Sequence, residues 1–411
     1  PPPPPTTTRV GIRRQRQMCI RDSTNTVELE YSGRKYAIDT GFIVFNERTY
    51  PNFIKLLDEL DVAWQDSDMG FSVQHEKTGL EYSGSTINSL FAQRSNLFRP
   101  SFYRMIREIL RFNREAPSLL DSTAESISLQ DYLSRENYSR EFIDHFIIPM
   151  GAAIWSAKPE VMGKMPAAFF IRFFQNHGML SVNDRPVWRV IKGGSNRYVE
   201  KLVAAYRDRI RLNAPVEFIR RFSDHVEVKV TGQEIESFDH VFMACHGDQA
   251  LQLLADPSLT EEQVLGKFHY QPNEAVLHTD DSLMPRKRRA WAAWNYHIPG
   301  YSQDRVAVTY NMNILQGIKA PATFCVTLNH SLTINPEKII DLFQYRHPVF
   351  TPESIEAQKR HAEINGAYRT YYCGAYWRNG FHEDGVVSAL TALKHFKESL
   401  QNGQRDFRRA G

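Results

Sequence analysis

The pattern of hydrophobic and polar positions divides the chain into stretches with strand spacing and stretches with helix spacing. From Thr26 the two kinds of residue alternate through "TVELEYSGRKYAID", and Ser32-Gly33 separates two such runs, so a β-hairpin is predicted. After Pro51, which suits the first turn of a helix, apolar residues recur every three or four positions in "NFIKLLDEL". This change of period predicts a helix with one buried face.

Helical spacing continues over much of the following sequence. We expect helices at residues 99–115, 128–136, 140–148 and 166–177. Together they would form a largely helical insertion.

Strand spacing returns near Pro186, where "PVWRVI" precedes Gly193-Gly194 and a helix capped by Ser195 or Asn196. Further strands are expected at residues 216–220, 226–230 and 240–244, in several runs between 273 and 329, and at 371–374. A last helix is predicted over residues 385–400. Strand–turn–helix units therefore flank two insertions, one helical and one rich in strands.

This alternation predicts an α/β chain, α+β overall, built from two interleaved domains. The first would comprise residues 24–50, 181–265 and 366–411, and the second the helical insertion 51–180 with the β insertion 266–365. The cleft between two such domains is the expected place for a ligand.

Residues 1–23 fit neither domain, because "PPPPPTTTRVGIRRQRQMCIRDS" has no helix or strand period. No apolar segment follows its basic residues, which argues against a signal peptide. The part "RRQRQMCIRDS" resembles translated adapter sequence. We therefore predict that residues 1–23 are a non-native, disordered tail.

The composition excludes several classes of protein. A net charge of +3 over 411 residues is too small to argue for a nucleic-acid partner. The four cysteines are far apart and show no Cys-x-x-Cys spacing, so they indicate neither a disulfide framework nor a zinc site, and they fit a reducing cytoplasm. The longest apolar stretch, residues 142–155, is too short to span a membrane. Nothing in these totals indicates an oligomeric state.

Near the C-terminus, "CGAYWRNGFHEDGVVSAL" joins a short strand to a helix expected to start at Asp384-Gly385. A helix start presents unpaired N–H groups and the positive end of its dipole to an anion or an electron-rich oxygen. Gly385 would leave room for such a ligand, and Gly374 would let the preceding loop fold tightly. The plainer alternative is capping, in which His382, Glu383 and Asp384 only satisfy the helix start.

Four segments together resemble the flavin-containing amine oxidoreductase superfamily, which includes monoamine and polyamine oxidases, protoporphyrinogen oxidase and phytoene desaturases. They are "AIDTGFIVFNERTYPNF", "VIKGGSNRYVEKL", "RRAWAAWNY" and "YYCGAYWRNGFHEDGVVSAL". They are similar in particular to a bacterial branch described only as predicted NAD/FAD-binding proteins, and the similarity runs from about residue 24 to about residue 400. The resemblance implies that the first domain is an FAD/NAD(P)-binding, Rossmann-like domain and that the cofactor is FAD.

The resemblance also implies roles for single positions. The segment Asp39, Thr40, Gly41 and Phe42 matches the one whose backbone passes close to the flavin ring, and Val216 matches the position that holds the adenine. The C-terminal helix would place its N-terminus under the flavin N1–C2=O edge, where it would stabilise negative charge. The other cofactor-binding residues implied are Gly193, Gly194, Gly374, His382, Glu383, Asp384, Gly385 and Val386.

One departure from the family concerns the phosphates. A dinucleotide site opens with Gly-x-Gly-x-x-Gly between a strand and a helix, and this sequence contains no Gly-x-Gly. The family usually carries a Gly-Gly pair just before the position of Thr24, where the non-native tail ends. We therefore expect that a first βαβ segment of about 30 residues is missing upstream. A truncated fragment that cannot hold FAD and is inactive is thus one alternative.

In flavin oxidases of this kind, the resemblance implies, a substrate gives a hydride to flavin N5, and the protein supplies orientation, exclusion of water and electrostatics. Candidates for the pocket that faces the flavin are Trp294 and Tyr296, on one face of a strand, with Tyr376 and Phe381 from the C-terminal motif. Aromatic residues more often belong to the core, which is the competing interpretation for each. No metal site is expected, since His382 has no second histidine at helical spacing.

The substrate is less constrained. Amine oxidases of the superfamily generally place a lysine near N5 through water, and we find no counterpart in this sequence. Arg104, Arg107, Arg111 and Arg114 recur on one side of a predicted helix, a pattern of a solvated face or of contact with anionic lipid. The related branch is implied in lipid or fatty-acid modification.

Two enzyme functions are therefore predicted besides the inactive fragment. The first is an FAD-dependent oxidoreductase that oxidises an apolar substrate, such as a lipid or fatty-acyl chain. It would be cytoplasmic, with possible peripheral contact with a membrane. The second is a flavin amine oxidase that produces peroxide.

Overall fold

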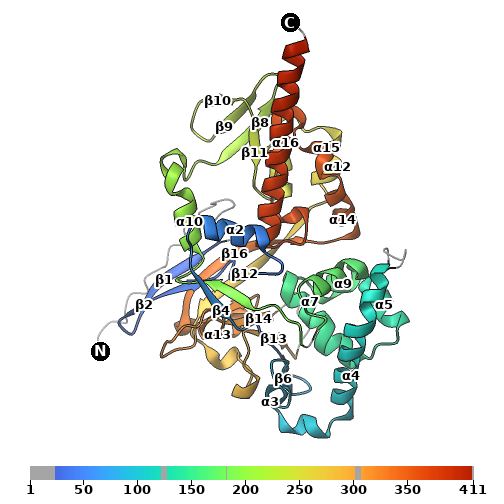
Figure 1. The fold of residues 1–411 in the computed structure, drawn as a ribbon. Coiled ribbons are helices and arrows are strands. Elements are labelled where there is room, and N and C mark those ends of the chain that lie inside the picture. Colours follow the sequence, from blue (N-terminus) through green and yellow to red (C-terminus); the bar gives the residue numbers. More distant parts are fainter. Residues whose placement is uncertain (1–23, 122–126, 182, 301–306, 410–411) are drawn as a thin grey trace.

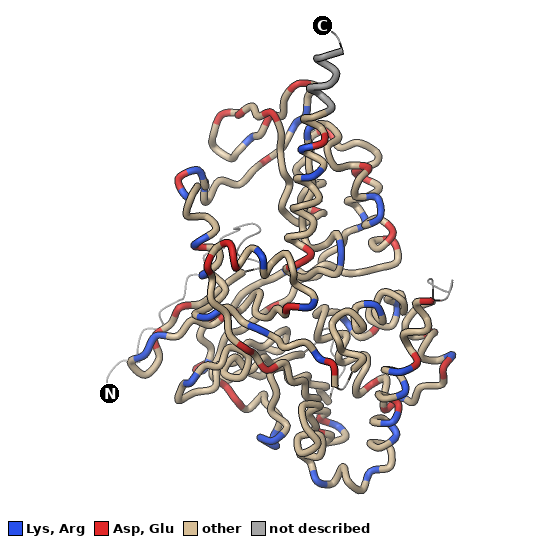
Figure 2. Tube along the Cα trace, viewed as in Figure 1, with Lys and Arg blue, Asp and Glu red and all other residues tan. Residues whose placement is uncertain are grey.

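The computed structural model describes residues 24–121, 127–181, 183–300 and 307–409, and the predicted tail at residues 1–23 lies outside them. A strand-rich middle part separates an upper part, which carries the long C-terminal helix, from a lower part made mainly of helices (Figure 1). Basic and acidic residues are interleaved along most of the trace (Figure 2).

The first elements are those that the alternation predicts. Strands β1 (Thr26–Tyr31) and β2 (Arg34–Asp39) form an antiparallel hairpin. Its turn residues Ser32 and Gly33 both have positive φ, as a two-residue hairpin turn requires. The helix predicted after Pro51 is α2 (Pro51–Glu59). Both predictions are confirmed.

The middle part is a mixed seven-stranded sheet in the order β16-β12-β15-β14-β13-β5-β6, in which only β13 and β5 run parallel. Its strands are β5 (Phe71–His75), β6 (Leu80–Ser83), β12 (His269–His278), β13 (Trp294–Ile298), β14 (Ala307–Asn311), β15 (Cys325–Leu328) and β16 (Ile339–Val349). Short α13 (Met312–Leu315) follows β14. The predicted β insertion thus supplies most of this sheet.

Two strands of the sheet, β5 and β6, come from the stretch that we predicted to be largely helical, and that part of the prediction is wrong. Strand β4 (Trp64–Ser67) was missed as well, and with β3 (Val44–Asn46) it flanks β7 (Trp188–Ile191) in a second small sheet. Strands β4 and β5 are four and five residues long, and their partners β7 and β13 lie more than a hundred residues away. Strand β6 pairs with its sequence neighbour β5 at the edge of the sheet. Pairing with distant strands, and not local alternation, thus determines the conformation of β4 and β5.

The lower part contains the four predicted helices. They are α4 (Pro100–Glu115), α5 (Leu129–Arg135), α6 (Arg140–Phe142) continued by α7 (Ile148–Trp155), and α9 (Ala167–Asn176), with a π-helical turn Ile143–Ile147 joining α6 to α7. The helix predicted at residues 140–148 therefore continues to Trp155. Two further short helices, α3 (Ile87–Leu90) and α8 (Pro159–Lys164), were not predicted. Side chains of these helices and of the seven-stranded sheet form one hydrophobic cluster, in which Phe142 and Phe170 belong with Tyr296 and Val308.

The upper part combines α10 (Asn196–Val203), β8 (Val216–Arg221), β9 (Val226–Val230), β10 (Ile235–Phe238), β11 (Val241–Met243), α11 (Gly247–Leu253), α12 (Leu259–Leu265), α14 (Pro352–Lys359), α15 (His361–Ile364), β17 (Thr370–Tyr372) and α16 (His382–Arg409). Strands β8 to β10 form an antiparallel sheet, and β11 pairs with β17 in parallel. The predicted strands here are confirmed, and the mixed helix and sheet class is confirmed for the chain. Helix α16 begins three residues before the predicted start at Gly385.

A separate hydrophobic cluster lies where the parts meet. Phe53 from α2 packs there with Phe45, Ile191 and Tyr198. Helix α2 and strand β4 therefore pack with segments of the predicted first domain, although the predicted boundary at residue 51 assigns them to the second. The division into two domains stays a prediction. In the described part of the chain, no helix combines the length and apolar character needed to cross a membrane.

Candidate functional site

The end of β2 is tied to two other segments through the carboxylate of Asp39. This side chain is fully buried. Its Oδ1 accepts hydrogen bonds from Thr26 Oγ1 at 2.6 Å, from Ser195 N at 2.8 Å and from Ser195 Oγ at 2.9 Å, and its Oδ2 accepts one from Gln316 Nε2 at 3.0 Å. Burial raises the pKa of Asp39 to about 6, and the hydrogen bonds oppose that rise. The carboxylate therefore joins the hairpin, the Gly-Gly loop and the end of α13.

Backbone conformation and packing explain why the Gly-Gly loop contains Gly193 and Gly194. Gly193 and Gly194 have φ of +82° and +97°, which residues with a Cβ rarely adopt. A Cβ on Gly194 would lie 2.5 Å from Thr26 Cγ2. The chain's own backbone and packing therefore require both glycines, and a cofactor contact at these positions stays a prediction.

His382, the first residue of α16, connects the C-terminal motif to the other two. Its Nε2 lies 2.6 Å from the hydroxyl of Tyr198, which in turn lies 2.8 Å from Thr24 Oγ1. The ring of Phe42 stacks on the imidazole at 3.9 Å between centroids. Burial lowers the pKa of His382 to about 4, so the imidazole is neutral at pH 7. Motifs that are more than 150 residues apart in the sequence thus meet at one place.

The sequence did not single out Thr24, Thr26, Tyr198 or Gln316 as parts of this network. Tyr198 belongs to the segment "VIKGGSNRYVEKL", so its helical position after the glycines was a usable signal. Thr40, which was singled out, contacts the hydroxyl of Tyr345 at 2.9 Å. Only the three-dimensional arrangement shows that these hydroxyls share one site.

The carboxylates of Glu383 and Asp384 accept hydrogen bonds at or just before the starts of helices. Glu383 accepts hydrogen bonds from Asn52 Nδ2 at 2.6 Å and from Phe53 N at 2.9 Å, at the first turn of α2. Asp384 Oδ2 accepts hydrogen bonds from Phe381 N at 2.9 Å and from Asn379 N at 3.2 Å, and burial raises its pKa to about 6. The side chains thus act as caps, as the plainer alternative holds. Contact of their backbone N–H groups with a cofactor stays a prediction.

Gly385 differs from the other glycines of the site. It is the fourth residue of α16, and its N–H donates to Phe381 O at 3.2 Å. A Cβ built on Gly385 would meet no atom of the described residues within 4 Å. Nothing in the packing of the chain therefore requires glycine here. Open space beside a first helical turn, whose N–H groups lack intrahelical partners, fits the electron-rich edge of a flavin.

Trp294 and Tyr296 lie on β13, two residues apart, so their side chains point to the same face of the sheet. Tyr296 is buried in the large hydrophobic cluster, and Trp294 packs against that cluster. The indole Nε1 of Trp294 is buried and has no hydrogen-bond partner among the described residues. Such an orphaned donor suits a site that holds a further molecule.

Phe381 connects the C-terminal motif with the helical part. Its ring stacks on Phe173 of α9 at 5.0 Å, and Trp155 Nε1 of α7 donates to Asn379 O at 3.2 Å. Phe381 packs against the same hydrophobic cluster that contains Tyr296. Three of the four pocket candidates therefore share one cluster.

The fourth candidate, Tyr376, belongs to a different cluster in the upper part, where it lies 4.8 Å from Phe268. A Cβ on Gly374 would lie 2.4 Å from Tyr376 Cε1, so Gly374 makes room for this ring. Val216 packs against the same upper cluster, and Val386 packs against the cluster around Phe53. The structure thus does not bring Tyr376 together with Trp294 and Tyr296.

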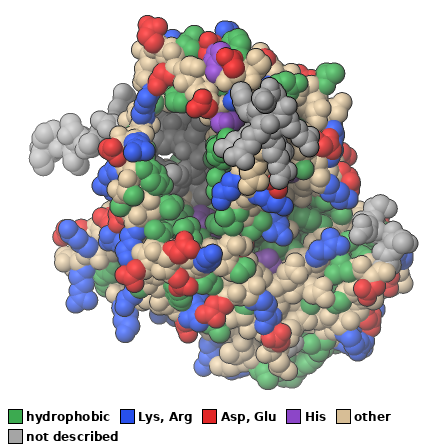
Figure 3. Space-filling view, turned by 45° about the horizontal axis from the view of Figure 1, so that its top comes forward, with side chains coloured by type: hydrophobic (Ala, Val, Ile, Leu, Met, Phe, Trp, Pro, Cys, Tyr) green, Lys and Arg blue, Asp and Glu red, His purple; other side chains and the backbone are tan. Residues whose placement is uncertain are grey.

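The surface between the upper and middle parts is hollowed, with hydrophobic and histidine side chains around the opening (Figure 3). A hollow of this kind between two parts of a chain is the usual place for a small ligand.

The buried histidines make the free energy of unfolding depend on pH. Burial lowers the pKa of five histidines to about 4, namely His177, His278, His347, His361 and His382. The unfolded chain takes up these protons near pH 6.5, so the free energy of unfolding falls as the pH drops from 6.5 to 4. Asp39 and Asp384, whose pKa values are raised to about 6, act in the opposite direction but are fewer.

We therefore expect the unfolding temperature to fall by several degrees between pH 7 and pH 5. Thermal unfolding in a pH series at constant ionic strength checks this. An unfolding temperature that rises on acidification would contradict it and would show that the two carboxylates dominate.

The family model for flavin-containing amine oxidoreductases matches residues 24–289, which is more than half of the chain. The chain belongs to the flavin-containing amine oxidoreductase family. This flavin oxidoreductase is thus an FAD-dependent enzyme, and FAD is its cofactor, as the resemblance implied. No curated protein matches it.

Solved structures agree with the family. Cyclohexylamine oxidase from Brevibacterium oxydans IH-35A is 13% identical, with a TM-score of 0.63 over 92% of this chain and 91% of that one. A putative protoporphyrinogen oxidase from Exiguobacterium sp. 255-15 is 16% identical, with a TM-score of 0.65 over 92% and 90%. A CLA-producing fatty acid isomerase from P. acnes is 13% identical, with a TM-score of 0.61 over 90% and 89%. At such identities the similarity shows the fold alone.

Proposed function

We propose that this flavin oxidoreductase removes a hydride from an apolar substrate of the lipid or fatty-acyl class. When bound, FAD supplies the hydride acceptor, flavin N5. The first turn of α16 would hold the flavin edge through its N–H groups, and the open space at Gly385 supports this assignment. Neutral His382 adds no charge there, so the helix start would be the main source of positive potential.

One observation carries the choice of an apolar substrate. None of the seven strands of the sheet contains a lysine, so the sheet behind Trp294 and Tyr296 offers no ammonium group that could act near N5. The surroundings of these two residues are instead apolar and aromatic. Such walls exclude water from a substrate and orient it by shape.

Phe381 and Trp155 have separate roles in this proposal. Phe381 would close the pocket on the side of the C-terminal motif, because it stacks between that motif and α9. Trp155 would line the entrance from the helical part, held by its hydrogen bond to Asn379 O. Both are positioning residues.

The second candidate is a flavin amine oxidase that produces peroxide. It is favoured by the family and by similarity to solved structures named cyclohexylamine oxidase and putrescine oxidase. The absence of a lysine from the sheet argues against it.

The test starts from the visible spectrum of the purified chain after FAD has been added and the excess removed. We expect a retained flavin band, and then anaerobic bleaching of that band by long-chain fatty acids or their esters but not by cyclohexylamine or putrescine. Bleaching by the amines, with peroxide released in air, would favour the second candidate. A chain without a flavin band would support a fragment that cannot hold the cofactor.

We further propose that the enzyme works in the cytoplasm and takes its substrate at a membrane surface. An apolar chain partitions into lipid and is scarce in water, so an enzyme that consumes it gains from peripheral contact with the bilayer.

A further inference from the structure

A basic stretch without any acidic residue lies between Glu81 and Glu108. Residues 82–107 contain four arginines and no lysine, aspartate or glutamate. This stretch alone carries +4, whereas the whole chain carries +3. It forms the lower end of the molecule, from α3 to the first turns of α4, and the marked positions at that end are basic (Figures 1 and 2).

The same stretch exposes large apolar side chains. Phe98, at the end of the 3-10 turn Arg94–Phe98, is 86% exposed, and Ile87, at the start of α3, is 80% exposed. Leu97 and Tyr103 are exposed as well. Single exposed apolar residues are common, but several on neighbouring elements form a patch, which usually marks an interaction site.

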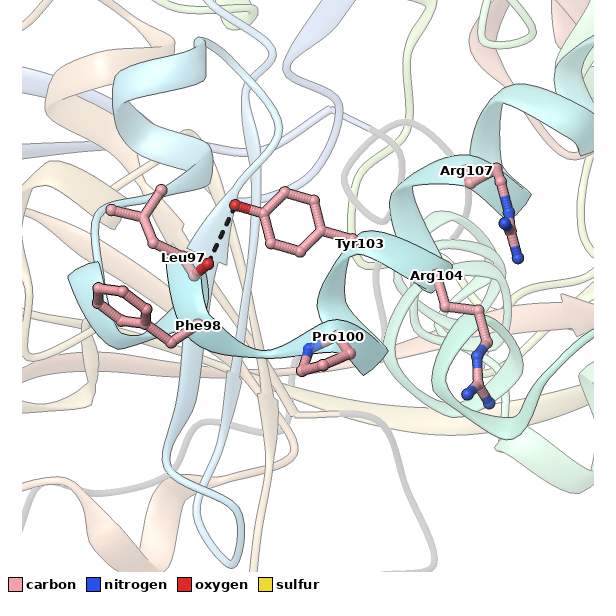
Figure 4. A pocket seen from close by; sticks show the side chains of 6 residues that line it. All are labelled: Leu97, Phe98, Pro100, Tyr103, Arg104 and Arg107. Carbon is pink, nitrogen blue, oxygen red and sulfur yellow. Dashed lines mark hydrogen bonds between the residues drawn. The ribbon is translucent and has the colours of Figure 1, made fainter.

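These residues surround an open depression between the 3-10 turn and α4 (Figure 4). Leu97, Phe98, Pro100 and Tyr103 line its apolar side, and Arg104 and Arg107 line the other. The hydroxyl of Tyr103 donates to Leu97 O at 3.1 Å, which fastens the turn to the helix. The apolar and cationic groups are therefore held side by side on a fixed scaffold.

The four arginines of the predicted stripe differ in the contacts that they make. Arg111 lies over the ring of Tyr138 at 4.0 Å, and Arg114 pairs with Glu115 at 2.6 Å. Arg104 is 3.9 Å from Glu141, and Arg107 makes no ion pair with any residue that the structure describes. In the first half of α4, Arg107 is thus exposed without an ion pair to a described residue and Arg104 has only a long one, and both line the depression that Phe98 also lines. Arg111 and Arg114 in the second half are engaged by Tyr138 and Glu115.

We propose that Ile87, Leu97, Phe98, Tyr103, Arg104 and Arg107, the α3–α4 surface, dock on an anionic phospholipid bilayer. Exposed apolar side chains can enter the boundary between head groups and acyl chains, while neighbouring guanidinium groups bind the phosphates. The proposal rests on the proposed lipid substrate for its purpose, and on charge and exposure for its location.

Two other occupants fit the surface less well. A second copy of the chain would bring the four arginines of each copy together, and like charges oppose such a contact. A nucleic acid would use the arginines and could stack bases on Phe98 and Tyr103, but it would leave the aliphatic Ile87 and Leu97 without an apolar partner. An anionic bilayer matches both the charge and the apolar side chains.

The test uses the full chain without FAD and flotation with vesicles of phosphatidylcholine alone or with 30% phosphatidylglycerol. We expect binding to the anionic vesicles only. Ile87→Ser with Phe98→Ser should weaken that binding by about tenfold, since it removes the groups that insert. Arg104→Glu with Arg107→Glu should weaken it by about tenfold or more, and this loss should shrink at high salt.

Control variants are Leu332→Ser, at a leucine that is fully exposed in the 3-10 turn Ser331–Thr333 after β15, and Lys55→Glu on α2. Every variant retains the basic residues 1–23, so binding through that segment alone would leave the serine variant unchanged. Equal binding by the serine variant and the parent, equal losses in the controls, or no binding to anionic vesicles would each overturn the proposal. So would a dimer that the serine substitutions dissociate while vesicle binding persists.

Because flotation needs no flavin, the two proposals fail separately. If the chain does not retain FAD but floats with anionic vesicles, the proposal for the α3–α4 surface stands and the proposed function fails. If the chain retains FAD but does not float, the proposal for the surface fails and the proposed function stands.

Discussion

A Gly385→Leu variant is expected to lose FAD while its protein fold remains intact. A Cβ at this position meets no atom within 4 Å in the part of the chain that the structure describes, so leucine has room in the apoprotein. Because leucine favours a helix over glycine by up to about 1 kcal/mol, the apoprotein should be as stable as the parent or more so. If the flavin edge occupies the open space, the leucine side chain fills it and the cofactor cannot approach the N–H groups of α16.

The measurement is an FAD titration of parent and variant, with thermal unfolding of both apoproteins. We expect the dissociation constant for FAD to rise by at least about a hundredfold, the loss of several close contacts. Gly84→Leu is the matched control, since Gly84 also has open space at its Cβ and lacks a positive φ. Unchanged FAD affinity in Gly385→Leu would refute the assignment of this helix start.

A Gly194→Ala variant should lose stability, by about 3 kcal/mol. The φ of +97° costs a residue with a Cβ about 1–2 kcal/mol, and the Cβ would approach Thr26 Cγ2 to 2.5 Å. Relief of that contact moves Thr26 or the loop, and both are hydrogen-bonded to Asp39. The buried carboxylate then loses donors, which adds to the cost.

Denaturant unfolding measures this difference, and Gly193→Ala is the control. Gly193 also has positive φ, but a Cβ there meets only the flexible side chain of Arg197, at 3.6 Å. We expect a loss of about 1 kcal/mol for this control. Equal losses in the two variants would show that backbone strain alone accounts for both, and that the contact with Thr26 contributes nothing.

Local patterns predicted the elements that depend on local forces. The β1–β2 hairpin followed from alternation around Ser32-Gly33, and α2 from its spacing after Pro51. The start of α16 was misplaced by three residues, because Asp384 reaches back to Phe381 N and extends the helix to His382. Such a cap depends on side-chain geometry that residue types alone do not define.

The candidate site was predictable as a set of motifs but not as a set of contacts. Resemblance to a flavin family indicated Asp39, Gly194 and His382, and the structure brings their segments together. The same structure engages the carboxylates of Asp39, Glu383 and Asp384 in holding the fold. A buried carboxylate must find donors wherever the fold supplies them, and residue types alone do not identify those donors.

The sequence by itself determined the mixed fold class, the family and its FAD cofactor, since these depend on periodicity and on short, contiguous sequence motifs. Only the tertiary structure decided which groups remain available. It showed open space at Gly385, separated Tyr376 from Trp294 and left Arg107 exposed at the depression that Phe98 also lines. Availability depends on what packs against a side chain, and in a chain of this length those neighbours come from distant segments.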